Sequence, residues 1–399
     1  MKSLNTKMLK KVFATRRGIW IYLRHMWIAM LAFIIVGILT LITVNISFLN
    51  PVAQVVRTFS LTDIYYQALS EYPDTSHAIT VVDMSELYTR SEVASLIYDI
   101  ESTQPKTIGV DITFQDKRTD LIGNDMLVDI ARTFNNIVFA FYRQDVQNNE
   151  QTEVHSFFTD SIFVTEGFTD MPRGLYGVMK RKVPLAGEAR GKLCQSFSSA
   201  VVNMYAEKEI VPLQERDLNI NFRPTSFIVV KPDSVLMHPE WFEGRIVLIG
   251  GVNRLEDMHD TPLGKMAGTV LLAYSIQTIL EDKEVQLLPT LWLSLLSFFI
   301  VMLTSAGLYA YSEMIERRIS NEFVEKLLKT SYVVGILISL WTAVLLGITF
   351  IIFCKWNINI NLGWAFAAIS CIGGSMSFYT VLYDTMLARK KRKNKSNIQ

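Results

Sequence analysis

Acidic residues and a histidine lie near the ends of apolar segments, and their side chains could bind a cation or assist hydrolysis. Three of them, Asp257, His259 and Asp260, lie close together in the stretch RIVLIGGVNRLEDMHDTPLG. Asp83 and Asp111 lie at or near the ends of two other apolar runs. Carboxylate oxygens suit hard cations such as Mg²⁺ and Ca²⁺. The five residues are therefore a candidate ligand-binding site, provided that the fold brings them together.

The same five residues also have a structural explanation, which the sequence favours. Short carboxylates accept hydrogen bonds from the free N–H groups of turns and helix N-termini. Asp257 and Asp260 would then cap the turn or the helix that follows, while Asp83 and Asp111 would brace loops. His259 alone is more typical of a hydrogen-bonding loop residue than of a metal ligand. The structural role and the ligand pocket both remain open at this level.

Catalytic motifs are absent from the sequence. It contains no G-x-S-x-G motif, none of its five histidines belongs to an H-E-x-x-H motif, and no C-x-x-C pair suggests zinc. We therefore expect no enzymatic activity, no cofactor and no bound metal. A membrane-anchored, metal-dependent hydrolase is the distant alternative.

Apolar, β-branched runs alternate with segments of helical periodicity between residues 78 and 284. Such alternation predicts an α/β domain with a mainly parallel sheet. Ligands of open parallel sheets bind outside the carboxyl ends of the strands, which is where the five candidate residues would lie. The main predicted strands cover residues 78–83, 107–114, 137–143 and 245–251, and the helices cover 60–72, 90–103, 124–136, 196–209 and 266–284. Residues 218–224 and 226–232 are predicted as short strands, and 144–192 as an irregular excursion that could contain a β-hairpin.

Four glycines lie around the last predicted strand and the helix after it. Gly250 and Gly251 are interpreted as turn residues, because glycine tolerates a positive φ. They do not belong to the G-x-G-x-x-G pattern of a dinucleotide loop. Gly264 and Gly268 flank the start of the predicted helix and are expected to permit a tight entry into it.

Four long segments with almost no charge are typical of membrane-spanning helices, which need roughly 20 apolar residues. They cover residues 26–48, 290–311, 332–353 and 362–383. The first is interpreted as an uncleaved signal anchor, because its apolar region is long and no small-x-small cleavage site follows it. We therefore expect one span before the α/β domain and three after it.

Charge is strongly segregated along the chain and predicts its orientation. Residues 49–289 contain 33 Asp and Glu against 21 Lys and Arg, whereas the remainder contains 18 basic and 5 acidic residues. Basic residues crowd the segments before the first span and after the fourth, and such flanks stay in the cytoplasm. The pattern predicts a multi-pass membrane protein with both termini cytoplasmic and residues 49–289 outside the cytoplasm. It suits membrane lipid rather than nucleic acid as a partner.

The predicted organisation follows from these spans. Cys194 is the single cysteine of residues 49–289, so the α/β domain has no internal disulfide and must rely on its own core. The chain is divided into a basic N-terminus (1–25), the first span (26–48), the extracytoplasmic domain (49–289), the second span (290–311), a cytoplasmic helical loop (312–331), the third span (332–353), an external loop (354–361), the fourth span (362–383) and a basic tail (384–399).

The cytoplasmic loop shows helical periodicity of its own. Ile315, Ile319, Phe323 and Leu327 recur every four residues, beside Glu–Lys pairs at the spacing that supports a helix. One interpretation is a solvated helical connector. The other is a docking surface for a cytoplasmic protein or a neighbouring subunit.

Three segments together resemble a known family of bacterial extracellular sensor domains. They are ITVVDMSE with its following helix, TIGVDITF, and FEGRIVLIGGVNRLEDMHDTPLGKMAGTVLLAYSIQTIL. The chain resembles a CHASE-two domain protein, the second class of CHASE-type sensor domains of receptors. The family layout of one span, a large exterior α/β domain and three closely spaced spans agrees with the predicted organisation. LYTRSEV stands where members often have a Trp-Pro-rich stretch.

The resemblance implies a sensor or an accessory subunit, and likeness to receptors implies a homodimer. Members usually continue into a kinase or cyclase domain, but this sequence ends 16 residues after Tyr383. We therefore expect a non-enzymatic membrane sensor that binds a ligand or partner outside and signals through its spans to a separate protein. The alternative is a structural or assembly subunit of an envelope complex.

Overall fold

The computed structural model describes residues 16–45, 60–69, 71, 73–116, 120–146, 150–169, 179–189, 191–254 and 257–396. The chain divides into two compact units. One is an α/β unit formed by Asp63–Gln286, and the other is a helical unit formed by Met1–Thr62 with Leu287–Gln399. Most of the predicted basic N-terminus, the end of the first predicted span and the segment after it lie outside the described residues.

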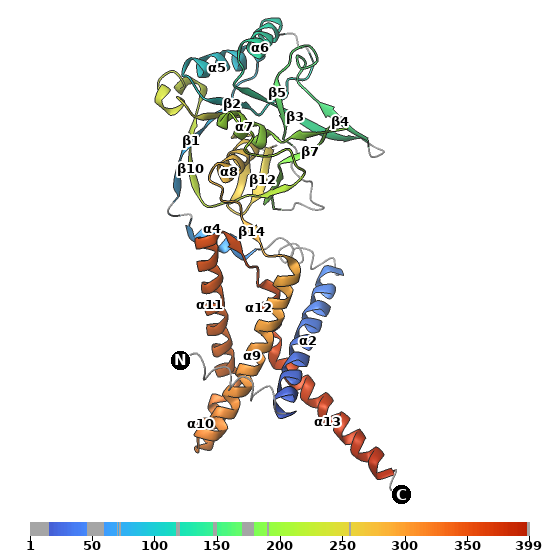
Figure 1. The fold of residues 1–399 in the computed structure, drawn as a ribbon. Helices are drawn as coiled ribbons and strands as arrows, with labels where there is room; N and C mark the ends of the chain where they lie inside the picture. The colour runs from blue at the N-terminus through green and yellow to red at the C-terminus, as the bar shows by residue number, and fades with distance from the viewer. Residues whose placement is uncertain are drawn as a thin grey trace, which may run out of the picture. The chain divides into compact units, whose positions relative to one another are not determined.

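A seven-stranded, mostly parallel sheet forms the centre of the α/β unit (Figure 1). The strands follow the order β10-β1-β11-β2-β3-β4, and β5 also pairs with β3. All of these pairs are parallel except β3 with β4. The strands are β1 (Asp74–Asp83), β2 (Thr107–Val110), β3 (Ile137–Val146), β4 (Glu150–Val154), β5 (Thr165–Phe168), β10 (Thr225–Val230) and β11 (Ile246–Gly250).

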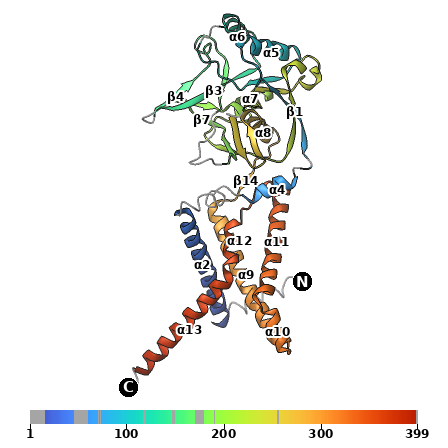
Figure 2. The same cartoon turned by 180° about the vertical axis from the view of Figure 1, so that it is seen from behind.

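Helices α5 (Arg90–Ser102) and α6 (Leu121–Thr133) follow β1 and β2 and lie side by side in both views of the ribbon (Figures 1 and 2). Apolar side chains of the two helices pack against the sheet in one buried cluster that includes Ile97, Leu127 and Val247. A capping box fixes the start of α5, since Thr89 and Glu92 each accept from the backbone of the other. The βαβ units predicted from the sequence are therefore present.

Two further helices, α7 (Phe197–Ala206) and α8 (Gly268–Leu280), pack on each other and on the central strands. Gly109 of β2 permits this approach, because a Cβ there would lie 2.8 Å from Leu248 and 2.9 Å from Phe197. Nine residues of α8 are buried, including Leu271, Ala273 and Ile276. Burial of this kind accounts for the strongly apolar sequence of α8.

Three details of the α/β unit differ from the sequence prediction. Strand β2 ends at Val110, four residues before the predicted end, and residues 111–114 have no strand assignment. The predicted helix 266–284 is shorter, since its first residues belong to a β-hairpin of β12 (Met258–Thr261) and β13 (Gly264–Ala267). The predicted excursion contains β4 and β5 and one strand of each of two small antiparallel pairs, β7 (Ala186–Ala189) with β8 (Lys192–Gln195) and β6 (Lys182–Pro184) with β9 (Asp217–Asn219).

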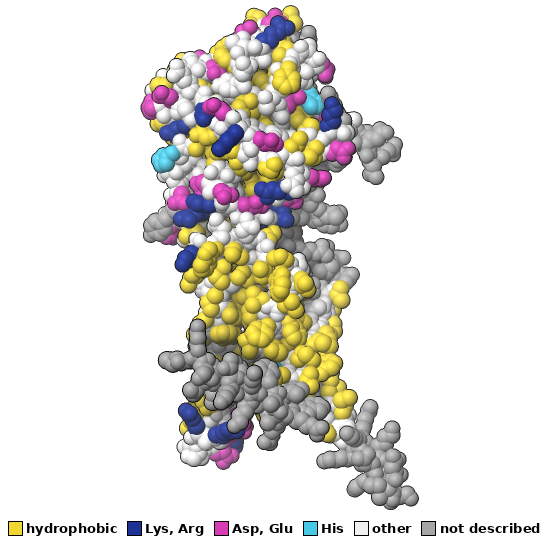
Figure 3. Space-filling model, in the orientation of Figure 1, with side chains coloured by type: hydrophobic (Ala, Val, Ile, Leu, Met, Phe, Trp, Pro, Cys, Tyr) yellow, Lys and Arg dark blue, Asp and Glu magenta, His cyan; other side chains and the backbone are white. Residues whose placement is uncertain are grey.

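The helical unit contains the long apolar helices. Among the described residues, three helices are long and apolar enough to cross a membrane, and a bent helix pair counts as a fourth. They are α2 (Arg16–Asn45), α9 (Thr290–Arg318), α11 (Ser331–Trp356), and α12 (Gly363–Ser370) with α13 (Ile372–Ser396), which meet at 54°. Hydrophobic side chains form a broad band on the visible surface of the helical unit (Figure 3). One apolar helix therefore precedes the α/β unit and three follow it.

Polar side chains join helices inside this unit. His25 Nδ1 of α2 lies 2.9 Å from Ser305 Oγ of α9, and both residues are buried. Trp341 Nε1 of α11 donates to Thr304 Oγ1 of α9 over 3.1 Å. Buried polar groups between apolar helices need such partners, because hydrocarbon offers none.

Candidate functional site

The carboxyl ends of the three central strands bring two of the predicted site residues close to the end of β11. Asp83 is the last residue of β1 and pairs with Gly250, the last residue of β11. Asp111 follows β2 directly, and its backbone N–H donates to Ile249 O over 2.9 Å. The two carboxylates therefore flank β11 at the edge where open parallel sheets bind ligands.

The Asp83 carboxylate holds the loop that follows β11. Its Oδ1 accepts from the backbone N–H groups of Ser85 and Val252, both over 3.0 Å, and from Ser85 Oγ, while Asn253 Nδ2 donates to its Oδ2. Burial alone would raise the pKa of Asp83, but these hydrogen bonds outweigh burial and hold the pKa below its ordinary value. Asp83 is thus an ionised brace between two loops.

Asp111 is tied to the first turn of α8 instead. Thr269 Oγ1 donates to Asp111 Oδ2 over 2.7 Å. Burial raises the pKa of Asp111 from 3.8 to about 6, the Thr269 hydrogen bond opposes this, and the charge of Asp257 adds to the rise while that of His259 lowers it. The pKa of the Asp111 carboxyl is therefore raised mainly by burial, and the charges of two neighbouring side chains modify it.

Gly250 is required by packing rather than by its backbone angles. The glycines with positive φ among the described residues are Gly191, Gly244 and Gly264, so the predicted turn conformation is wrong for Gly250 and Gly251. A Cβ on Gly250 would overlap Thr269 Oγ1 and lie 2.8 Å from Thr269 Cγ2. The end of β11 must therefore be glycine for α8 to approach it.

Asp257 and His259 form a pair beside the start of α8. Asp257 Oδ1 lies 3.4 Å from His259 Nε2. A Cβ on Gly268 would lie 2.5 Å from Asp257 Oδ2, so this carboxylate lies against the first residue of the helix. Negative charge at that position is favourable because of the helix dipole. A side chain on Gly268 would therefore meet the Asp257 carboxylate.

Asp260 and Gly264 have separate places in the β12–β13 hairpin. Asp260 is exposed and alternates with His259 along β12, so the two side chains point to opposite faces. Gly264 adopts φ +100° at the turn of the hairpin rather than at the entry to the helix. Asp257 and His259 lie next to each other and act electrostatically on Asp111, whereas Asp83 has its own hydrogen-bond donors and Asp260 points to the other face of the hairpin.

The geometry favours structural roles for much of this edge. Within the described residues, no group of three or more His, Cys, Asp or Glu side chains could hold a metal ion. The sequence did not point to Ser85, Asn253 and Thr269, whose side chains donate hydrogen bonds to the Asp83 and Asp111 carboxylates. A signal existed for Ser85, because Asp-x-Ser is typical of a side chain that bonds the backbone two residues on. Thr269 gave none, since its partner is distant in the sequence.

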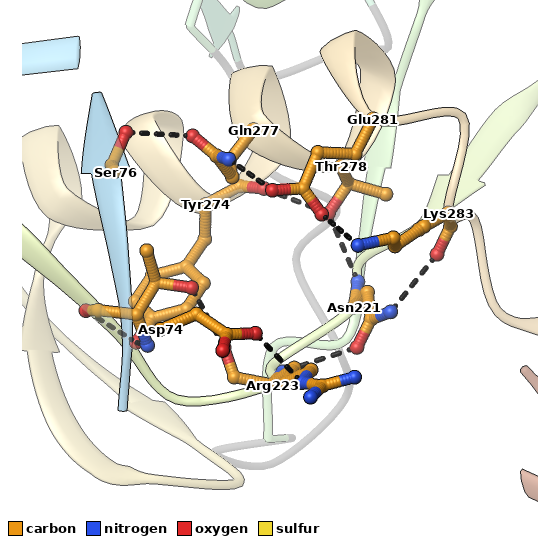
Figure 4. A network of polar contacts seen from close by, with 10 residues as sticks. Asp74, Ser76, Asn221, Arg223, Tyr274, Gln277, Thr278, Glu281 and Lys283 are labelled. Carbon is orange, nitrogen blue, oxygen red and sulfur yellow. Dashed lines mark hydrogen bonds and ion pairs between the residues drawn. The ribbon is translucent and has the colours of Figure 1, made fainter. Parts of the chain in front are cut away.

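A second polar network fixes the other end of α8 (Figure 4). Ser76 of β1 donates to Gln277 Oε1 over 2.8 Å, and the backbone N–H of Asn221 donates to Thr278 Oγ1 over 3.1 Å. Asn221 Nδ2 also donates to Lys283 O over 3.0 Å, just after the helix. The network continues through ion pairs of Lys283 with Glu281 and of Arg223 with Asp74, both at 2.8 Å. Helix α8 is therefore held by polar contacts at both ends.

The predicted docking residues do not form one exposed helical face. Helix α9 ends at Arg318, and a new helix, α10 (Glu322–Leu328), begins after the N-cap Asn321. Ile315 is buried, whereas Phe323 and Leu327 are 75 % and 49 % exposed. The predicted Glu322–Lys326 and Glu325–Lys329 pairs are present at 2.5 and 2.7 Å. The four-residue periodicity does not correspond to one helix, because α9 ends before Ile319 and α10 begins after it.

Comparison with known protein families identifies the domain type. Residues 28–308 match the CHASE2 domain, which covers more than half of the chain. The chain belongs to the CHASE2 family. No curated protein and no solved structure matches it. The CHASE2 sensor domain, together with the apolar helices before and after the α/β unit, identifies a membrane protein of sensor type.

Proposed function

We propose that this CHASE2 protein is a non-enzymatic membrane sensor whose α8 passes a change at the carboxyl edge of the sheet toward the second span. The supporting observation is the attachment of α8 at both ends. Thr269 in its first turn bonds Asp111, and Gln277 and Thr278 in its last turns bond Ser76 and Asn221. A helix held in this way moves as one body.

The dimensions suit such a lever. Helix α8 has 13 residues and so extends about 20 Å from the carboxyl edge. Its C-terminal end continues through residues 281–289 into α9. Glu284 ties this connection to the α/β unit, because Arg216 Nη1 donates to its Oε2 over 2.8 Å. A ligand or partner that favours one position of α8 would therefore favour one arrangement of the connection.

The charge pattern supports an orientation with residues 49–289 outside the cytoplasm and both termini inside. In that orientation the ligand or partner binds on the extracytoplasmic side, and a separate protein, or a second copy of the chain, receives the signal. Binding is favoured over turnover because Asp83 and Asp111 are both engaged by protein donors. The assembly-subunit alternative shares the same orientation but needs no coupling through α8.

Hydrogen exchange of the full chain in lipid nanodiscs tests the coupling. Asp111→Asn changes the contact at the start of α8, and Asp260→Asn is the matched control on the exposed hairpin. We expect Asp111→Asn to change exchange in residues 281–289 by about two- to thirtyfold, the range of typical coupling energies. If both variants changed hydrogen exchange only at the carboxyl edge, coupling through α8 would be refuted and the assembly-subunit alternative would be favoured.

A further inference from the structure

A cavity of about 560 Å³ lies within the helical unit, between α2, α9 and the start of α12. Its volume falls in the range of about 300–1,000 Å³ that is usual for pockets of small molecules. Its wall is largely apolar and aromatic, with Phe33 and Phe298 stacked 6.3 Å apart between ring centroids, and Trp364 also lines it. The contribution of α9 runs from Thr290 to Phe298, which is about 12 Å of helix.

The polar groups of this cavity are uncharged. Thr290, Ser294, Ser297 and Asn361 line it, and none of the described residues that line it is acidic or basic. A charged group would gain no ion pair here and would lose its hydration, which is costly in an apolar environment. The occupant therefore presents an uncharged portion that combines hydrocarbon with hydrogen-bonding atoms.

Ser297 provides the decisive observation. Several hydroxyls of the helical unit donate to the carbonyl four residues earlier, as Thr304 does to Ile300 and Ser339 does to Gly335. Ser297 is only 4 % exposed and lines the cavity, yet its hydroxyl has no hydrogen-bond partner within the described part of the chain. A hydroxyl that faces hydrocarbon without a partner costs free energy, because hydrocarbon offers no hydrogen bond.

We propose that the cavity binds a membrane glycerolipid. One acyl chain packs on Phe33 and Phe298, and an ester carbonyl oxygen accepts a hydrogen bond from Ser297 Oγ. A glycerolipid joins an uncharged ester to hydrocarbon, and the bilayer supplies it directly to helices of this length. The site is separate from the carboxyl edge of the α/β unit, so this inference stands or falls independently of the sensor function proposed above.

Native mass spectrometry of the full chain tests the proposal after reconstitution in vesicles of phosphatidylethanolamine and phosphatidylglycerol. Ser297→Phe fills the cavity, whereas Ser339→Phe adds the same ring to the exposed surface of α11. We expect the wild type and Ser339→Phe to retain one phospholipid at collision energies that strip all others. Retention by Ser297→Phe should fall at least tenfold.

Ser297→Ala keeps the cavity and removes only the hydroxyl, so it serves even if Ser297→Phe does not fold. We expect about fivefold weaker lipid retention, the effect of one net hydrogen bond. Equal retention by the wild type and all three variants would overturn the proposal, as would loss in Ser339→Phe alone. Unchanged retention in Ser297→Ala would overturn the ester assignment. A retained mass equal to a second copy of the chain would replace the lipid by a neighbouring subunit.

Discussion

Thr269 and Asp111 are joined by a hydrogen bond of 2.7 Å that connects the first turn of α8 to the residue after β2. The same hydroxyl occupies the space above Gly250 at the end of β11. One threonine thus fixes a helix against two strands. Substitution of Thr269 or Asp111 should therefore weaken the packing of α8 on the sheet and leave the rest of the core unchanged.

Gly250→Ala should destabilise the α/β unit by about 3 kcal/mol. The added methyl group overlaps Thr269, and inserting atoms into a packed core forces the backbone to shift. Chemical denaturation of the full chain in detergent, followed by circular dichroism, measures the change in the free energy of unfolding.

Gly251→Ala is the matched control, because its methyl group would meet only the flexible side chain of Arg254, at 3.0 Å. It should change the free energy of unfolding by less than about 1 kcal/mol. Equal losses in the two variants would show that the backbone, and not the Thr269 hydroxyl, requires glycine here.

Asp111→Asn should remove a pH dependence of stability. The folded state raises the pKa of Asp111 from 3.8 to about 6, so the protonated carboxyl stabilises the fold below pH 3.8. That contribution is lost as the pH rises through 6, and it amounts to about 3 kcal/mol at most. Thermal unfolding between pH 4 and pH 7.5 should show a smaller fall in stability for Asp111→Asn than for the wild type. Parallel profiles would contradict the assignment.

Asp83→Ala should lower the free energy of unfolding by about 3 kcal/mol, because it leaves donors of Ser85, Val252 and Asn253 without their acceptor. Asp260→Ala at the exposed hairpin position should stay within about 0.5 kcal/mol of the wild type. Denaturation curves of the two variants, measured side by side, test this. Similar small losses would mean that water replaces Asp83 as the acceptor.

His25 and Ser305 should show coupling between α2 and α9. Their side chains are buried and 2.9 Å apart, and such bonds between membrane helices contribute about 0.6–1.7 kcal/mol. A double-mutant cycle with His25→Ala and Ser305→Ala measures the coupling by unfolding in detergent. The pair His25→Ala and Ser339→Ala should be additive. Additive effects in both cycles would show that the contact between His25 and Ser305 does not contribute to stability.

Cysteine labelling checks the predicted orientation. In a chain with Cys194, Cys354 and Cys371 replaced, Phe163→Cys and Phe323→Cys place single thiols at positions that are 100 % and 75 % exposed. A membrane-impermeant maleimide should label Phe163→Cys in intact cells, and Phe323→Cys only after permeabilisation. The opposite pattern would invert the topology that the basic residues predict.

The main elements of the α/β unit could be predicted because their burial leaves a local pattern in the sequence. The apolar runs of β1 and β11 and the periodic helix α5 appear without knowledge of their neighbours. The β12–β13 hairpin was not predicted from the sequence, because its residues are mixed in polarity and the adjacent segment of α8 has a stronger apolar pattern. Local propensity cannot separate a hairpin from a helix entry in such a segment.

The positions of Asp83 and Asp111 could be predicted, but their hydrogen-bond partners could not. Placing Asp83 and Asp111 at strand ends needs only the topology rule for parallel sheets. Their partners depend on residues far along the chain, such as Asn253 for Asp83 and Thr269 for Asp111. The packing requirement for glycine at position 250 could not be predicted either, because the close approach of a distant helix leaves no pattern in the neighbouring residues.

The position of β11 has a consequence for how the protein is made. This strand is the last of the sheet to be synthesised, yet it lies between β1 and β2 and pairs Ile79 with Ile246. Strands β1 and β2 therefore cannot complete their pairing until residues 246–250 have been synthesised. Folding that waits on distant contacts is slow and leaves strand edges open to aggregation. Nascent chains halted before Arg245 should accordingly depend on chaperones for their solubility.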